Sequence, residues 1–268
     1  MTDTYEVFAI KYATRNDRTR GDSFIFDDDH ASPHAVDYFL WVIRNADRTI
    51  VVDTGFDAAE AGARGRELLR DPLSGLIANG VDPDTVDDVI ITHLHYDHAG
   101  CLDRFPRALF HVQAQEVAFA TGPCMCHDAI RAPYTAEHVC TMIRKIYSGR
   151  VMFHDGAAQV APGVEVHCVG GHSRGLQCVR IMTRRGPLVL ASDASHYFEN
   201  FMANKPFPIV DRVSDMLDGF ATILRLAGEE ARVIPGHDPL VCDLYRGDGS
   251  GDPDCFALHA DPRFTLAS

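Results

Sequence analysis

The chain has 268 residues, of which 46% are hydrophobic and 24% are charged, as is typical of a soluble globular protein. Its formal net charge of -13, without a long block of lysines or arginines, argues against nucleic-acid binding, because phosphates require a basic surface. The apolar run YFLWVI (38–43) is too short to span a bilayer, so we do not expect a membrane protein.

The first twenty residues lack the apolar core of a secretory signal peptide. We therefore expect a cytoplasmic protein, in which the eight cysteines remain thiols. Cys124 and Cys126 form a C-x-C motif, but no second pair follows at zinc-finger spacing. These two residues are thus interpreted as ordinary thiols, and not as metal ligands.

Short β-branched runs that end in polar or glycine-rich turns recur along the chain and predict strands. The runs are TIVV (49–52), DVII (88–91), VEVHCV (164–169), LVLA (188–191) and ARVI (231–234). Between them, 136–147 and 214–227 place apolar residues on one helical face, which indicates packing against a core. Alternating strands and helices favour an α/β class or a layered sandwich. We expect one domain over 1–268, with 246–268 as a loosely attached tail.

Residues that commonly bind metals follow the ends of four predicted strands. The His-rich stretch ITHLHYDHAG (91–100) follows the second strand in the list above, and single residues follow the next three. Loops at strand ends present side chains to a pocket while the sheet holds them in place. The residues are His93, His95, Asp97, His98, His172, Asp193 and His237.

The spacing within H-L-H-Y-D-H predicts two adjacent metal sites. Residues two apart in an extended segment face the same way, so His93 and His95 can bind one ion with His172. If a helical turn follows, Asp97 and His98 point to a second ion, shared with His237. Asp193 can bridge the two through its carboxylate. Imidazole and carboxylate ligands without thiolate suit two divalent ions, zinc first, with Mn, Fe or Co as alternatives.

A single histidine at a strand end is more often a hydrogen-bonded structural residue than a ligand. We interpret six other histidines in this way: His111, His127, His138, His154, His167 and His259. Four coordinating groups within six residues have no comparable packing explanation.

The chain resembles the metallo-β-lactamase superfamily over roughly residues 5–245. The resemblance is carried by TIVVDTGFD, THLHYDHAG, GGHSRG, LASDAS and VIPGHD. It implies a four-layer αββα sandwich with a dinuclear site at one edge of the two sheets. It also implies the same seven ligands, with Asp53 as a supporting residue and not a ligand.

Within the superfamily, the chain is most similar to the N-acyl homoserine lactonase group. The similarity rests on Asp193-Ala194-Ser195, Glu199-Asn200 and Pro235-Gly236-His237-Asp238. It implies a quorum-quenching hydrolase that opens a lactone. Where that group places a tyrosine three residues after the bridging Asp, this chain has His196, followed by Tyr197. An imidazole can donate the same hydrogen bond, so His196 or Tyr197 is expected to orient the substrate.

In the expected mechanism, a hydroxide shared by the two metals attacks the ester carbonyl, and Asp97 carries the proton to the leaving oxygen. Residues 122–148 are interpreted as a lid over the pocket. Apolar candidates for contact with the acyl chain are Phe24, Phe26, Met125 and Phe207. A lactone substrate is the only expected partner, and the protein is expected to be a monomer or homodimer.

Three other activities stay open. The first is hydrolysis of another lactone or a cyclic amide in catabolism. The second is a thioesterase of the glyoxalase II type, although only about thirty acidic, glycine-rich residues follow His237. The third is a mononuclear iron oxidoreductase that uses His93, His172 and Asp193, which leaves the second ligand group without a purpose.

Overall fold

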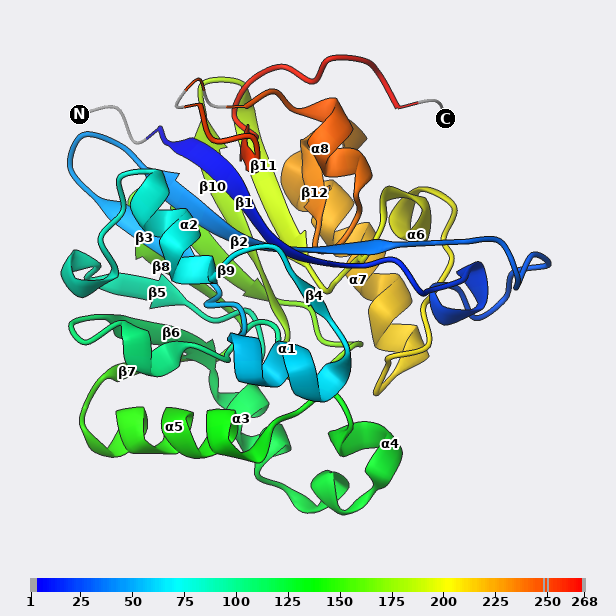
Figure 1. Ribbon diagram of the computed structural model, residues 1–268, viewed down its shortest axis with the longest axis horizontal. Coiled ribbons are helices and arrows are strands. Elements are labelled where there is room, and N and C mark those ends of the chain that lie inside the picture. Colours follow the sequence, from blue (N-terminus) through cyan, green and yellow to red (C-terminus); the bar gives the residue numbers. More distant parts are fainter. Residues whose placement is uncertain (1–3, 248, 250, 267–268) are drawn as a thin grey trace.

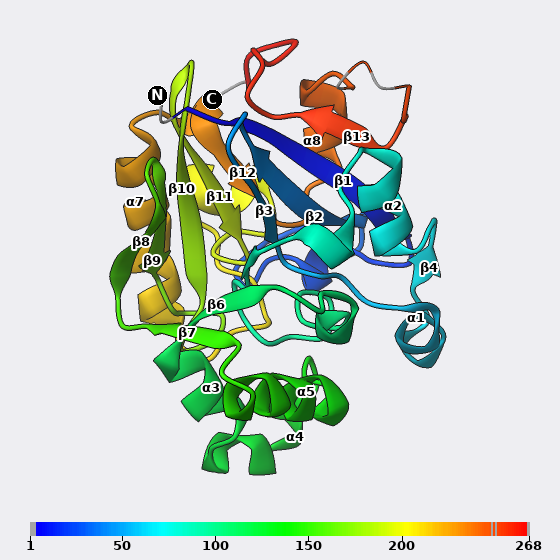
Figure 2. The ribbon, with the colours of Figure 1, turned by 90° about the vertical axis from the view of Figure 1, so that its left-hand side faces the viewer.

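Two β-sheets packed face to face form the centre of the computed structural model, which describes residues 4–247, 249 and 251–266 (Figures 1 and 2). In the described residues, the larger sheet has the order β13-β1-β2-β3-β5-β6-β7, with β4 paired to β1. Its strands are β1 (Glu6–Arg15), β2 (Val36–Arg44), β3 (Thr49–Val52), β4 (Glu67–Leu68), β5 (Asp88–Ile90), β6 (Leu109–Gln113), β7 (Val151–His154) and β13 (Cys255–Ala257).

The smaller sheet has the order β12-β11-β10-β9-β8. Its strands are β8 (Ala157–Ala161), β9 (Val164–Cys168), β10 (Gln177–Thr183), β11 (Gly186–Ser192) and β12 (Val233–Pro235). The strands β3, β5, β6 and β7 pair in parallel, as do β11 and β12, while the other ladders are antiparallel. Parallel neighbours end at the same edge, which places the loops after β5, β11 and β12 where a site can form.

Helices cover the outer face of each sheet (Figure 2). They are α1 (Ala58–Arg64), α2 (Pro72–Ala78), α3 (Ala114–Ala120), α4 (Asp128–Arg131), α5 (Ala136–Tyr147), α6 (Phe198–Met202), α7 (Val213–Ala227) and α8 (Leu240–Leu244). The expected apolar faces are confirmed. On α5, Met142 is buried, and on α7 Phe220 and Ile223 are buried before Gly228 ends the helix in a left-handed conformation.

Side-chain alternation on β1 explains the layers. Val7 and Ala9 face the smaller sheet, whereas Phe8 and Ile10 face the helices on the other side. Both faces of the strand are therefore buried, and the chain forms the expected αββα sandwich. No helix in the described part of the chain is long and apolar enough to cross a membrane.

The expectation of a loosely attached tail over 246–268 was wrong for its central part. The strand β13 pairs with β1, and Leu258 is fully buried in the core. Arg70 also forms an ion pair of 2.6 Å with Asp252. The sequence did not indicate this edge strand, because the glycine-rich stretch before it is typical of a loop. Residues 248, 250 and 267–268 lie outside the described residues.

Candidate metal centre

The loop after β5 carries the histidine-rich motif and presents its ligand-type side chains to one point. Leu94 is fully buried in the core, while His93 and His95 on either side of it face the smaller sheet's loops. The chain then makes a single turn, in which the backbone N–H groups of His98 and Ala99 both donate to His95 O at 3.1 Å. This turn, and not a longer helix, brings Asp97 and His98 to the second group.

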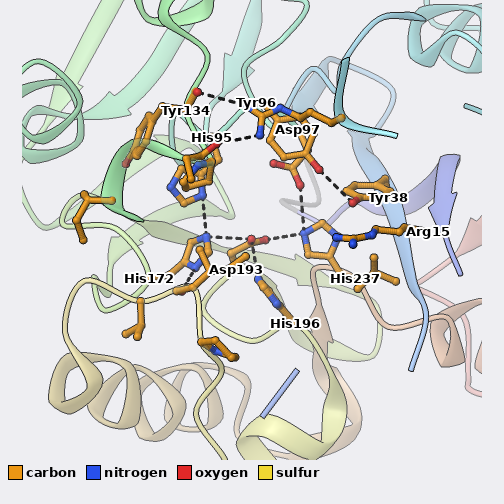
Figure 3. Close-up of a pocket in the computed structure, with 18 of the residues that line it drawn as sticks. Arg15, Tyr38, His95, Tyr96, Asp97, Tyr134, His172, Asp193, His196 and His237 are labelled. Carbon is orange, nitrogen blue, oxygen red and sulfur yellow. Dashed lines mark hydrogen bonds and ion pairs between the residues drawn. The ribbon is translucent and has the colours of Figure 1, made fainter. Parts of the chain in front are cut away.

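All seven residues predicted as ligands come together, as Figure 3 shows for the part of the site that it labels. Within each group, the ligand-type atoms lie within 4.8 Å of one another. One group is His93, His95 and His172, and another is Asp97, His98 and His237. These are the two sets that the spacing predicts.

The Asp193 carboxylate lies between the two groups. Its Oδ2 is 3.1 Å from His172 Nε2 and 3.8 Å from His93 Nε2. Its Oδ1 is 3.1 Å from His237 Nε2 and 3.2 Å from His98 Nε2. Each oxygen therefore faces one group, as a bridging carboxylate requires.

Three of the histidines are oriented through their second ring nitrogen. His98 Nδ1 lies 2.7 Å from Asp53 Oδ2, which agrees with the supporting role expected of Asp53. His172 Nδ1 lies 2.6 Å from Ile209 O, and His237 Nδ1 lies 2.8 Å from Asp37 O. Metal-binding histidines usually hold their other ring nitrogen to a carboxylate or a carbonyl in this way.

Polar atoms without a partner show that the centre fits cations. His93 Nε2, His98 Nε2 and Asp193 Oδ1 are buried and, apart from the ion-pair contacts given above, make no hydrogen bond to any described residue. An unpartnered buried polar atom is unfavourable, so these atoms need a ligand in the space between them. The His and Asp groups thus fit a dinuclear metal site.

The pKa shifts of the clustered histidines also agree with a site for cations. Burial lowers the pKa of His93 and of His95, which keeps both imidazoles neutral and able to coordinate. Burial also opposes the protonation of His98, but the carboxylates of Asp193, Asp97 and Asp53 raise its pKa well above the usual value. The second group therefore attracts positive charge, which a bound cation would supply.

His196 lines the centre, but Tyr197 does not. His196 Nε2 lies 2.9 Å from Asp193 Oδ2, and its ring stacks on Phe207 at a centroid distance of 3.8 Å. Its Nδ1 has no hydrogen-bond partner among the described residues. Burial lowers the pKa of His196 to about 3, so the ring is neutral. The Tyr197 hydroxyl instead contacts Ala35 O and Ser23 Oγ, away from the pocket. Of the two candidates for substrate orientation, the structure brings only His196 to the site.

A cavity of about 330 Å³ opens above the centre. Segment 122–148, predicted as a lid, contributes Ile130 and Pro133 to the lining, and the loop before α7 contributes Ile209 and Val210. The expected contacts Met125, Phe207, Phe24 and Phe26 are not among the lining residues. Phe207 is fully buried and supports His196 from behind, while Phe26 is exposed to solvent. Segment 122–148 thus lines the cavity as expected, but the apolar side chains expected to contact the acyl chain do not.

Glu116 is a site residue that the sequence reasoning missed. The carboxylate of this α3 residue is fully buried and accepts hydrogen bonds from Leu94 N, Ser173 Oγ and Gly175 N, at 2.7–3.0 Å, and from Tyr134 OH at 3.2 Å. It thereby joins both histidine loops to Tyr134, whose ring packs against His95. A lone Glu on a short helix gives no signal of this in the sequence.

A sandwich of two sheets with paired His/Asp groups at the strand ends defines a metal-binding protein of the αββα class. Residues 37–239 match the Metallo-beta-lactamase superfamily, and the chain belongs to this family. The expected superfamily is therefore confirmed.

Characterised relatives of the chain are lactonases by name. The chain is 28% identical over 182 residues to the N-acyl homoserine lactonase AiiB of Agrobacterium fabrum. This alignment covers 60% of this chain and 64% of AiiB. It is 33% identical over 129 residues to the N-acyl homoserine lactonase AiiA of Bacillus thuringiensis subsp. kurstaki. That alignment covers 48% of this chain and 46% of AiiA. The chain thus spans less than two thirds of the length of either relative.

Solved structures share the fold. An N-acyl homoserine lactone hydrolase with the product N-hexanoyl-L-homoserine at its catalytic metal centre superposes with a TM-score of 0.73 at 22% identity, over 88% of this chain and 94% of that one. AidC, a dizinc quorum-quenching lactonase, superposes with a TM-score of 0.66 at 15% identity, over 87% of each chain.

Proposed function

We propose that this protein is a metal-dependent hydrolase that opens a lactone ring, with N-acyl homoserine lactones as the first ring class to test. The observation that carries the proposal is the position of Asp193, whose two carboxylate oxygens each face one His group. The names of the relatives AiiB and AiiA support the choice of a cyclic ester.

Two divalent ions bound there would acidify a water and polarise the ester carbonyl. In the net reaction, oxygen from water joins the carbonyl carbon and the ring C–O bond breaks. A hydroxy acid forms, and one proton is released at neutral pH. Zinc is the metal that we propose, because the ligands are imidazole and carboxylate and the similar structure AidC is dizinc.

Two residues of the chain have proposed roles beside the metals. The Asp97 carboxylate lines the cavity, and its Oδ2 is 3.7 Å from His237 Nε2. We propose that this carboxylate carries a proton to the leaving alkoxide. The free Nδ1 of the neutral His196 ring can donate to or accept from the substrate, depending on its tautomer.

The first experiment measures acid release by the zinc-loaded protein in weak buffer with a pH indicator. The substrates are short- and long-chain N-acyl homoserine lactones, simple γ- and δ-lactones, and S-lactoylglutathione. We expect ring opening that is lost after chelation and restored by zinc. Asp193→Asn should bind fewer than two zinc ions per chain and lose at least about 100-fold in kcat/KM, because its amide presents a single neutral oxygen to two cations.

Turnover of the thioester alone would replace this proposal with a thioesterase. Asp193→Asn with full zinc content and unchanged turnover would refute the bridging role. The expected cytoplasmic location and the expected monomer or homodimer stay predictions.

A further inference from the structure

Four arginines line the cavity above the metal centre, in a chain whose formal net charge is -13. They are Arg15, Arg18, Arg64 and Arg66. Positive side chains gathered at one cavity of an acidic protein form a local field that attracts anions. The partners of each arginine decide whether this charge is available to a ligand.

Two of the four are neutralised within the protein. Arg15 Nε forms an ion pair of 2.7 Å with Asp17. Arg64 is paired with Glu60 and donates to Ala132 O, Tyr134 O and Thr135 Oγ1. Arg64 therefore links α1 to the lid segment, and its charge is already balanced.

The other two have no carboxylate partner among the residues that the structure describes. Arg18 is only 7% exposed and donates through Nη2 to Asp22 O and Ser23 Oγ, while its buried Nε has no hydrogen-bond partner in the described part of the chain. Arg66 donates through Nε to Tyr96 OH and through Nη1 to Arg64 O. A guanidinium has five N–H donors, so both groups retain capacity for an anion.

Both charges act on the same wall of the cavity. The Arg66 guanidinium donates to Tyr96 OH, which donates to Tyr38 OH at 3.1 Å, and the Tyr38 ring packs against His237 (Figure 3). Arg18 and Arg66 line the same cavity as Tyr38 and as Asp97 and His237 of the second His/Asp group. The two arginines therefore lie near the second His/Asp group, on the side of Tyr38.

A purely structural role does not balance these charges. The neighbouring carboxylate of Asp17 is bound to Arg15, and that of Asp22 accepts from Thr19. Arg18 is buried, and a buried cation without an ion-pair partner is unfavourable unless a ligand supplies the negative charge. Arginine also presents the planar fork that carboxylate and phosphate groups match.

We infer that the lactone opened at this site carries an anionic oxygen group, a carboxylate or a phosphate, which Arg18 and Arg66 bind beside the metal centre. This inference rests on the proposed lactonase function and narrows its substrate class. The cavity volume, near the lower end for small-molecule sites, suits a compact ring with one charged substituent. Neutral acyl homoserine lactones would then be poorer substrates than their anionic analogues.

The test compares lactones that differ only in charge, opened by zinc-loaded full-length protein. One γ-lactone bears a ring carboxylate, a second bears the neutral carboxamide, and a third bears a phosphate ester. A second pair has an N-acyl homoserine lactone whose chain ends in a carboxylate or a carboxamide. We expect kcat/KM to be about 10- to 100-fold higher for an anionic member than for its carboxamide, since hydrogen bonds to charged groups are that strong.

Arg66→Gln and Arg18→Gln should bring this ratio close to one, because the KM for the anion rises much more than the KM for the carboxamide. Arg107→Gln is the matched control. It removes an exposed guanidinium that pairs with Asp87, and neither residue lines the cavity, so it should leave the ratio intact. If Arg18→Gln does not fold, the partly exposed Arg66 decides the question alone.

Preference for the carboxylate or for the phosphate identifies the anion, and either supports the inference. Equal rates for charged and neutral rings in the wild type would overturn it, as would an equal loss on both rings in Arg66→Gln. Calorimetric binding of the ring-opened dicarboxylate separates the two proposals. If no lactone is opened but Arg66→Gln still weakens this binding about tenfold, only the lactonase function fails.

Discussion

At the scale of single residues, the metal centre depends on close approach as well as on its ligands. Gly236 precedes the proposed ligand His237, and a methyl group at this position would lie 2.8 Å from Asp193 Oδ1 and from the Ser192 carbonyl. Real Cβ atoms do not approach other atoms so closely, and two of these neighbours are backbone. Ser192 itself has a positive φ of 48° next to the bridging carboxylate. This backbone is therefore held in place by the surrounding packing.

Gly236→Ala should disturb the bridging carboxylate without removing any ligand. We expect the zinc content to fall below two per chain and kcat/KM to fall by about tenfold or more, as when a residue that orients a metal ligand is lost. Metal analysis of the purified variant measures the first effect.

Gly62→Ala serves as the control, since nothing lies within 4 Å of the added methyl group on α1. It should retain full metal content. Two bound zinc ions and unchanged rates in Gly236→Ala would show that the loop relaxes around the methyl group.

At the scale of elements, one buried carboxylate holds three segments around the centre. Glu116 on α3 accepts from the loop after β5, from the loop after β9 and from Tyr134 before α5. Burial raises the pKa of Glu116, while its hydrogen-bond donors lower it, with Leu94 N as the strongest. Each carboxylate oxygen of Glu116 accepts two hydrogen bonds: Oε1 from Leu94 N and Tyr134 OH, and Oε2 from Ser173 Oγ and Gly175 N.

Glu116→Gln should leave the Gly175 or the Leu94 N–H facing an amide NH₂ group. We expect a loss of about 2 kcal/mol in the free energy of unfolding, because a buried donor loses a charged acceptor. Urea unfolding followed by fluorescence measures this loss.

Glu137→Gln, on the exposed face of α5, is the matched control and should change stability by less than about 0.5 kcal/mol. Equal stability of the two variants would mean that the Glu116 amide finds a new set of partners.

At the scale of the whole molecule, the centre joins the two halves of the sandwich. Its residues come from the loop after β5 of the larger sheet and from the loops after β9, β11 and β12 of the smaller one. Ions bound there would connect the sheets and would bind the folded state alone. Metal binding should therefore stabilise the entire fold.

Removal of metal should lower the melting temperature. At a free zinc concentration of a thousand times Kd, binding contributes about 4 kcal/mol, which corresponds to roughly 8–16 °C for a chain of this size. Calorimetry of the chelated and reloaded protein measures the shift. Identical melting curves, with zinc shown to be absent and then bound, would contradict a site that spans both sheets.

The proposed ligands were predictable because each stands in a short sequence pattern at the end of a strand. H-L-H-Y-D-H places its own side chains, and His172, Asp193 and His237 each follow a β-branched run. The apolar faces of α5 and α7 were visible for the same reason, since a helix repeats over a few residues. The superfamily and the αββα architecture follow from these motifs.

Contacts between segments far apart in the chain were decided only by the tertiary structure. His196 and Tyr197 are neighbours in sequence, yet one ring faces Asp193 and the other faces Ser23. Nothing local marks Glu116, the strand β13 or the pair Arg18 and Arg66, because each acquires its role from partners on other segments. The sequence alone determined the family and the set of proposed ligands, since both depend on motifs of a few neighbouring residues. The shape and charge of the cavity arise from packing, which no short window of sequence contains.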